Sequence, residues 1–122
     1  MALTVLKNTP IHVVVAISGT SATETIDLSS TLATASQTAS SPKVNISAIY
    51  WSIPSGNATI TRNSNQLWAM TGSRDFQFHG FSDNRENTSN IVVVTPAGGG
   101  TVILELVKIS GYGDAQHVNP LT

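Results

Sequence analysis

Cysteine is absent from the 122-residue chain, and charged residues make up only 11% of it. Without cysteine there are no disulfides and no thiolate metal sites, so the core must hold without covalent cross-links. Six lysines and arginines are scattered singly against seven acidic residues, for a formal net charge of −1. Nucleic-acid binders usually concentrate basic residues that neutralise phosphates. We therefore do not expect this chain to bind DNA or RNA.

Long apolar runs are missing as well. The longest, from Val13 to Ile17, is far too short to cross a bilayer. The opening residues, MALTVLKNTP, lack a basic region followed by a long apolar stretch, so no secretory signal is expected. These features predict a soluble protein that is made in the cytoplasm and has no membrane partner.

Serine, threonine and asparagine keep the surface polar in place of charges, with 15, 15 and 9 copies respectively. Their side chains compete with the backbone inside helices, whereas threonine suits strands and asparagine suits turns. One segment, 28–41, has some helical spacing, but its many serines and threonines and the following Pro42 favour a loop or a poorly formed strand, with one helical turn possible. The composition therefore predicts β-structure.

Short β-branched or alternating segments recur along the chain, separated by proline, glycine and asparagine. The expected strands are 11–18, 24–28, 43–53, 58–62, 66–70, 75–81, 91–95 and 101–109. Pro54-Ser55-Gly56 and Gly72 are expected to end strands, 63–65 to form a hairpin turn, and the last two strands to pair as a hairpin. Together they predict a single-domain, all-β, antiparallel sandwich or barrel of about seven to nine short strands with little helix. The domain is expected to cover 1–111, with a polar loop at 29–42 and a C-terminal tail at 112–122.

Residues able to bind a metal are present but not in a recognisable pattern. The histidines, His12, His79 and His117, have no ligand spacing; two are expected on strands and the third in the tail. The loop 82–87 is rich in side-chain oxygens but carries Arg85 at its centre and lacks the spacing of a calcium-binding loop. We expect neither a metal nor a cofactor.

Catalytic motifs give no better match. No serine lies in a Gly-x-Ser-x-Gly elbow, and Gly98-Gly99-Gly100 precedes a strand without the Lys-Ser/Thr of a phosphate loop. The best arrangement for an enzyme would be a pocket that gathers His79, Asp83 and Arg85 from separate segments. The sequence instead predicts a protein that binds other proteins and is not an enzyme.

Aromatic residues leave one alternative open. Tyr50, Trp51, Trp68 and Tyr112 are candidates for a sugar-stacking platform, as in carbohydrate-binding modules. The two tryptophans lie in β-branched or apolar surroundings, which favours packing in the core or at a subunit interface. Burial of both tryptophans would remove the carbohydrate-binding alternative.

Two segments have no obvious role in a lone monomer: 19–41, which is long and polar, and 112–122 at the C-terminus. Segments of this kind can become ordered by lying across a neighbouring subunit, and they can also be loose loops. The low charge leaves little repulsion between closely packed copies. A protein used in many copies fits this combination.

The stretch 45–112 also carries a resemblance. Its residues are 44–51 (VNISAIYW), 61–63 (TRN), Leu67-Trp68, 80–84 (GFSDN), 87–89 (NTS) and 101–108 (TVILELVK). In these strand and turn segments the chain resembles small virion structural proteins of tailed bacteriophages, especially those that infect marine cyanobacteria. The segment 33–41 and the tail match nothing in that family.

The resemblance implies a capsid decoration, or cement, protein in the virion that binds the major capsid protein or other virion proteins. A neck or tail component is the alternative it leaves open. It also implies a homo-oligomer, a trimer or a dimer, whose copies gain avidity from simultaneous contacts. The residues we expect at contacts are Trp68, Arg74, Arg85, Tyr112 and His117.

Overall fold

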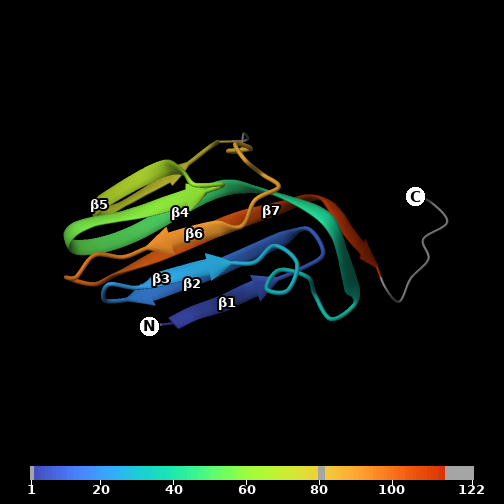
Figure 1. The fold of residues 1–122 in the computed structure, drawn as a ribbon, viewed down its shortest axis with the longest axis horizontal. Coiled ribbons are helices and arrows are strands. Elements are labelled where there is room, and N and C mark those ends of the chain that lie inside the picture. The colour runs from blue at the N-terminus through green and yellow to red at the C-terminus, as the bar shows by residue number, and fades with distance from the viewer. Residues whose placement is uncertain (1, 80–81, 115–122) are drawn as a thin grey trace.

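The structure, a computed structural model, describes residues 2–79 and 82–114. These residues contain no helix, and hence none that could cross a membrane; they form one curled antiparallel sheet (Figure 1). Its strands are β1 (Ala2–Asn8), β2 (His12–Gly19), β3 (Thr23–Ile26), β4 (Gln37–Arg62), β5 (Asn65–Gln77), β6 (Ile91–Val94) and β7 (Gly100–Asp114). The predicted all-β antiparallel fold class is confirmed.

The strands form long rows that run the length of the molecule. β5 lines one edge of β4, while β7 pairs with 37–52 of β4 and β6 with 59–62 on the other edge. β2 pairs with β7, and β3 pairs with β6, so β2 and β3 form the next row. The prediction that β6 and β7 form a hairpin is wrong. They follow one another along the same edge of β4, and each pairs with other strands.

Each of these rows is interrupted at the same position along the molecule, and we call this position the crease. It consists of 20–22 between β2 and β3, 54–57 within β4, Thr71 within β5, and 95–99 between β6 and β7. These interruptions lie together at the left-hand end of the molecule in Figure 1. Pro54-Ser55-Gly56 and Gly72 were expected to end strands, and that prediction is wrong. The chain bends there and then continues pairing with the same neighbour.

The crease is held by hydrogen bonds between the rows. Ser21 N donates to Pro96 O at 2.9 Å, and the Thr95 hydroxyl donates to Gly19 O at 3.1 Å. Gly56 has φ +81°, and a Cβ there would lie 2.7 Å from Pro96 Cβ. Only glycine combines this backbone conformation with such a close approach. The bend therefore depends on local backbone chemistry as well as on pairing.

The core lies within the curl of the sheet, where the inward residues of the two halves meet. β2 alternates as expected for a half-buried strand, with Val13, Val15 and Ile17 fully buried. The other large members are Ile26, Leu28, Leu32, Val44, Ile46, Ile49, Ile53, Ile60, Met70, Ile91, Val93, Val102, Leu104 and Leu106. Each fully buried aliphatic side chain contributes about 1.5–3 kcal/mol. This core is what makes the crease favourable.

Parts of the two segments without an obvious role in a monomer, 19–41 and 112–122, pair with each other. Residues 29–36 form the predicted loop, but 37–42 belong to β4, and β7 continues to Asp114. Gln37 pairs with Asp114 and Ala39 with Tyr112, giving an antiparallel ribbon. The predicted loop end at 42 and tail start at 112 are therefore wrong. The remainder of the tail, 115–122, lies outside the described residues.

β1 was not predicted. Leu3 and Val5 alternate, but Leu6 breaks the period at the point where the pairing with β2 shifts register, between Val5 and Lys7. A one-residue bulge hides the period-2 pattern from a sequence reading.

Candidate functional site

Three aromatic side chains cluster on the β5 side of the sheet. The ring centroids of Trp68 and Phe76 are 5.0 Å apart, and Phe78 lies 5.8 Å from Trp68 and 4.8 Å from Phe76. Trp68 precedes the crease in β5 and Phe76 follows it, so the bend brings them together. Trp68 and Phe78 pack against the core, whereas Phe76 is 41% exposed. We call these three residues the aromatic cluster.

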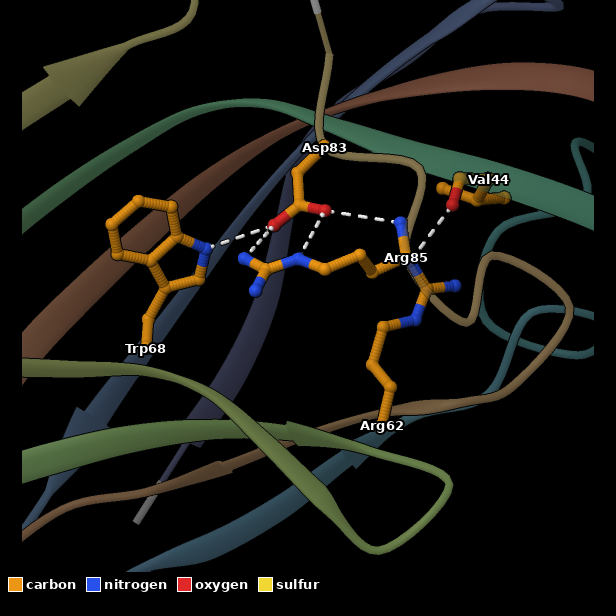
Figure 2. A network of polar contacts seen from close by, with 5 residues as sticks. All are labelled: Val44, Arg62, Trp68, Asp83 and Arg85. Atoms are coloured by element: carbon orange, nitrogen blue, oxygen red, sulfur yellow. Dashed lines mark hydrogen bonds and ion pairs between the residues drawn. The ribbon is translucent and has the colours of Figure 1, made fainter.

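Asp83 orients both Trp68 and Arg85 (Figure 2). The indole Nε1 of Trp68 donates to Asp83 Oδ2 at 3.0 Å. Arg85 donates from Nη2 to Oδ2 at 2.7 Å and from Nε to Oδ1 at 3.1 Å. The guanidinium carbon lies 5.8 Å from the centroid of the Trp68 ring, within reach of a cation–π contact. One buried carboxylate therefore positions an arginine beside the aromatic cluster.

The electrostatics of this pair favour the charged forms. Burial raises the pKa of Asp83, but hydrogen bonds from Arg85 and Trp68 outweigh it and leave that pKa below its usual value. The hydrogen bonds to Asp83 in turn raise the pKa of Arg85. The Asp83 side chain is 4% exposed and that of Arg85 is 55% exposed. The guanidinium of Arg85 is therefore exposed at the surface, and the buried carboxylate of Asp83 neutralises its charge.

The segment that carries Asp83 is hydrogen-bonded to the part of β4 that precedes the crease. Asp83 N donates to Ile46 O at 2.7 Å, and Ile46 N donates back to Asp83 O at 3.1 Å. Asn87 continues the attachment, since its carbonyl accepts from Val44 N at 2.9 Å. This anchoring limits the freedom of Arg85 and Trp68 before any partner binds.

Arg62 is fully buried beneath this segment. Its Nε and Nη2 donate to Ser89 O at 3.0 and 2.7 Å, and its Nη1 donates to Val44 O at 2.9 Å. Burial lowers its pKa to about 10, although Asp83 and Glu86 favour the charged form. Within the described residues the one ion pair is Arg85–Asp83. The hydrogen-bond partners of Arg62 are therefore carbonyl oxygens and not a carboxylate.

The expected contact residues are divided among three places. Trp68 and Arg85 meet at the aromatic cluster. Arg74 is exposed and lines a hollow of about 230 Å³ together with Tyr50, Trp51, Ser52, Thr101 and Ile103. Tyr112 lies in the ribbon, with its ring centroid 5.0 Å from Lys108 Nζ. His117 lies outside the described residues.

Sequence reasoning missed two buried cations. Lys108 is 7% exposed, and its Nζ donates to Asn8 Oδ1 at 2.8 Å, Gln37 Oε1 at 2.7 Å and Thr9 O at 3.0 Å. Burial lowers the pKa of Lys108 to about 8. The alternation of inward and outward positions along each strand could have predicted that both side chains are buried. Lys108 continues the inward series of Leu104 and Leu106, as Arg62 continues that of Ala58 and Ile60. Phe76 and Phe78 were recognised only as strand residues.

The sequence left three other kinds of site to consider: an enzyme pocket, a metal site and a carbohydrate-binding surface. His79 follows β5 in an exposed turn, so its expected placement on a strand is wrong. Within the described residues no hydrogen bond or ion pair joins it to Asp83 or Arg85. No group of three or more His, Asp or Glu residues within 2–79 and 82–114 is arranged to hold a metal ion. Trp51 and Trp68 are both half-buried, so the burial criterion does not remove the carbohydrate-binding alternative.

Comparison of the chain with protein-family models, with curated proteins and with solved structures finds no match. Functional inference therefore depends on the site itself. Tryptophan and arginine are enriched among the residues that dominate binding energy at protein interfaces, and phenylalanine is enriched in the interface core.

Proposed function

We propose that this protein is a non-enzymatic structural component of a tailed-phage virion, most simply a capsid decoration protein that binds major capsid subunits. The observation that carries the proposal is the aromatic cluster with Arg85 held beside Trp68 by Asp83. The resemblance of 45–112 to small virion structural proteins supports the same function.

The geometry suits protein recognition because much of the ordering cost is met before binding. Association normally loses free energy when long side chains such as arginine become immobilised. Here Arg85 is already fixed by two hydrogen bonds to Asp83, and the indole of Trp68 by a third. Phe76 then offers an exposed ring that a partner pocket can desolvate.

The proposed binding surface has little unbalanced charge. The net charge is −1, and the guanidinium of Arg85 is paired with Asp83. Binding through this surface should therefore depend mainly on apolar contact and shape. We expect the affinity to fall little as salt is raised, because screening acts on exposed, unbalanced charges.

Co-sedimentation with purified virion parts tests the proposal. The probes are heads and, separately, tails of tailed phages that infect marine cyanobacteria, with their decoration proteins removed. Wild-type protein should sediment with heads, and Phe76→Ala should weaken this binding about tenfold or more, the effect of a typical hot-spot residue. Lys43→Ala is the matched control, because Lys43 is exposed and lies outside the cluster.

The outcomes separate the alternatives. Binding to heads that Phe76→Ala weakens and Lys43→Ala does not supports a decoration role. Binding to tails alone places the protein in the neck or tail. Absence of binding to either, or equal binding by Phe76→Ala, contradicts the proposed surface.

A second candidate is a carbohydrate-binding module. The observation in its favour is the hollow where Tyr50 and Trp51 lie with the exposed Arg74. A glycan array probed with wild-type protein and with Tyr50→Ala and Arg74→Ala tests it. Glycan binding that both variants abolish, with head binding absent, would replace the virion proposal.

A further inference from the structure

β1 is an edge strand with one free side. It pairs with β2 and with no other strand in the described part of the chain. The residues Thr4, Val5, Leu6 and Lys7 are all exposed. A free strand edge presents unpaired N–H and C=O groups and is a template for pairing with another chain.

The exposed apolar surface is concentrated at this edge. Among the described residues five large apolar side chains are exposed, and three of them belong to β1 or to the turn after it. These are Val5, 37% exposed, Leu6, 55% exposed, and Ile11, 56% exposed. A partner that covered the edge would also remove these side chains from water.

The usual protection against edge pairing covers only part of β1. The pairing with β2 is regular from Ala2 to Val5 and shifts register after Val5, where Leu6 forms a bulge. Lys7, the one charged residue of β1, lies beyond that shift. Bulges and lysines protect strand edges, so the protected part begins at Leu6 and the stretch from Ala2 to Val5 stays open.

The open stretch is complementary to itself. Two identical antiparallel strands are related by a twofold axis, so directly opposite residues lie symmetrically about one residue. With the axis at Thr4, Leu3 of each copy lies opposite Val5 of the other, on the side of the sheet where Leu3 packs against the core. The two Thr4 residues then face one another. Threonine pairs and apolar pairs at such positions stabilise a sheet, and no like charges meet.

We propose that two copies of this chain pair through β1, antiparallel and centred on Thr4, so that one sheet continues across both. This interface deepens the proposed function by supplying the contact of the expected homo-oligomer. Its test contains no virion component. A failed head-binding experiment and a failed dimer experiment are therefore distinguishable.

Light scattering on the full chain gives the first test. The mass of the wild type should approach twice the monomer mass as its concentration is raised to about 100 μM, since mass action populates the dimer. Val5→Glu should shift the mass to the monomer, because two carboxylates would face apolar Leu3 residues. Ile109→Glu is the control: Ile109 is 49% exposed but belongs to β7, so its variant should remain dimeric.

A single cysteine then fixes the register. The chain has no cysteine, so Thr4→Cys can cross-link only to Thr4→Cys of another copy. Directly opposite residues in an antiparallel pair have Cα atoms about 4.5–5.5 Å apart, which is within the range for a disulfide. Mild oxidation should give a covalent dimer with Thr4→Cys and none with Thr71→Cys, an exposed crease residue. A monomeric wild type, a dimeric Val5→Glu or a failure of Thr4→Cys to cross-link in a dimeric protein would each overturn the proposal.

Discussion

Arg62 Nη1 donates a hydrogen bond to the carbonyl oxygen of Val44 at 2.9 Å, although both residues belong to β4 and lie 18 positions apart. An unbent strand would separate them by about 60 Å, at about 3.3 Å per residue. The contact exists because β4 turns back at the crease, so its two halves face each other. Arg62 therefore fastens one half of the strand to the other at the end opposite the crease.

Replacing Arg62 should destabilise the fold strongly. Arg62→Ala removes three hydrogen bonds from a buried guanidinium and leaves the carbonyl oxygens of Val44 and Ser89 without those donors. We expect a loss of roughly 2–4 kcal/mol in the free energy of unfolding, measured with urea. Arg74→Ala is the matched control and should unfold close to the wild type, because Arg74 is exposed. Equal stability of the two variants would contradict the clamping role of Arg62.

Two glycines at or beside the crease distinguish steric fit from backbone conformation. Gly56 has φ +81° and Gly72 has φ +72°, but a Cβ at Gly72 would meet nothing within 4 Å, whereas one at Gly56 would lie 2.7 Å from Pro96. Gly72→Ala should cost about 1 kcal/mol for the left-handed backbone alone. Gly56→Ala should cost about 1–3 kcal/mol more, because it adds a clash. Thermal unfolding of the pair measures the difference, and similar melting temperatures would show that the crease relaxes freely.

Lys108 should make stability depend on alkaline pH. Burial lowers its pKa to about 8 in the folded protein, from 10.5 when unfolded. Between these values the unfolded chain binds more protons, so the contribution of Lys108 to the free energy of unfolding rises with pH from about 8 upward. Urea unfolding of wild type and Lys108→Met at pH 7 to 10 isolates this contribution.

The control for that series is Lys43→Met, since Lys43 is exposed. Its pH profile should run parallel to that of the wild type, whereas the profile of Lys108→Met should lack the rise. Parallel profiles for all three proteins would mean that Lys108 keeps its ordinary pKa in the fold.

Asp83 should make the aromatic cluster sensitive to acid. Its folded pKa is lowered relative to 3.8, so its contribution to stability is complete above that value and is lost as the pH falls through the folded pKa. Asp83→Asn removes the carboxylate that holds Trp68 and Arg85, so it should lower stability at neutral pH and lack this acid transition. In a Trp51→Phe background the fluorescence of Trp68 should shift to the red. Asp75→Asn, at an exposed position of β5, should leave both properties unchanged.

Much of this architecture follows from local pattern. Runs of β-branched residues predicted β2, and alternating residues predicted the central part of β4 and β7. The turn at Asn63 and Ser64, whose φ angles are +50° and +62°, was predicted from residues that tolerate that conformation. These features depend on neighbours in the chain, so a single sequence is sufficient to find them.

The candidate site was predicted only in part. Trp68 and Arg85 were named as contact residues, and the structure brings them together. Asp83, which joins them, was considered only for a calcium-binding loop and for an enzyme pocket, and Phe76 was predicted only as a strand residue. Their roles depend on contacts across the crease and between loops, which sequence spacing does not reveal.

The sequence by itself determined that this chain forms antiparallel strands and that no disulfide supports them. Only the tertiary structure decided whether the residues that interrupt strands end them or bend them. Pro54, Gly56 and Gly72 have the chemistry of strand ends, yet they form a crease because the rows on both sides keep their partners. Whether a break ends a strand or bends it depends on the apolar surface buried when the two halves meet. That burial is a property of distant residues packed together, so it can be seen only in the folded chain.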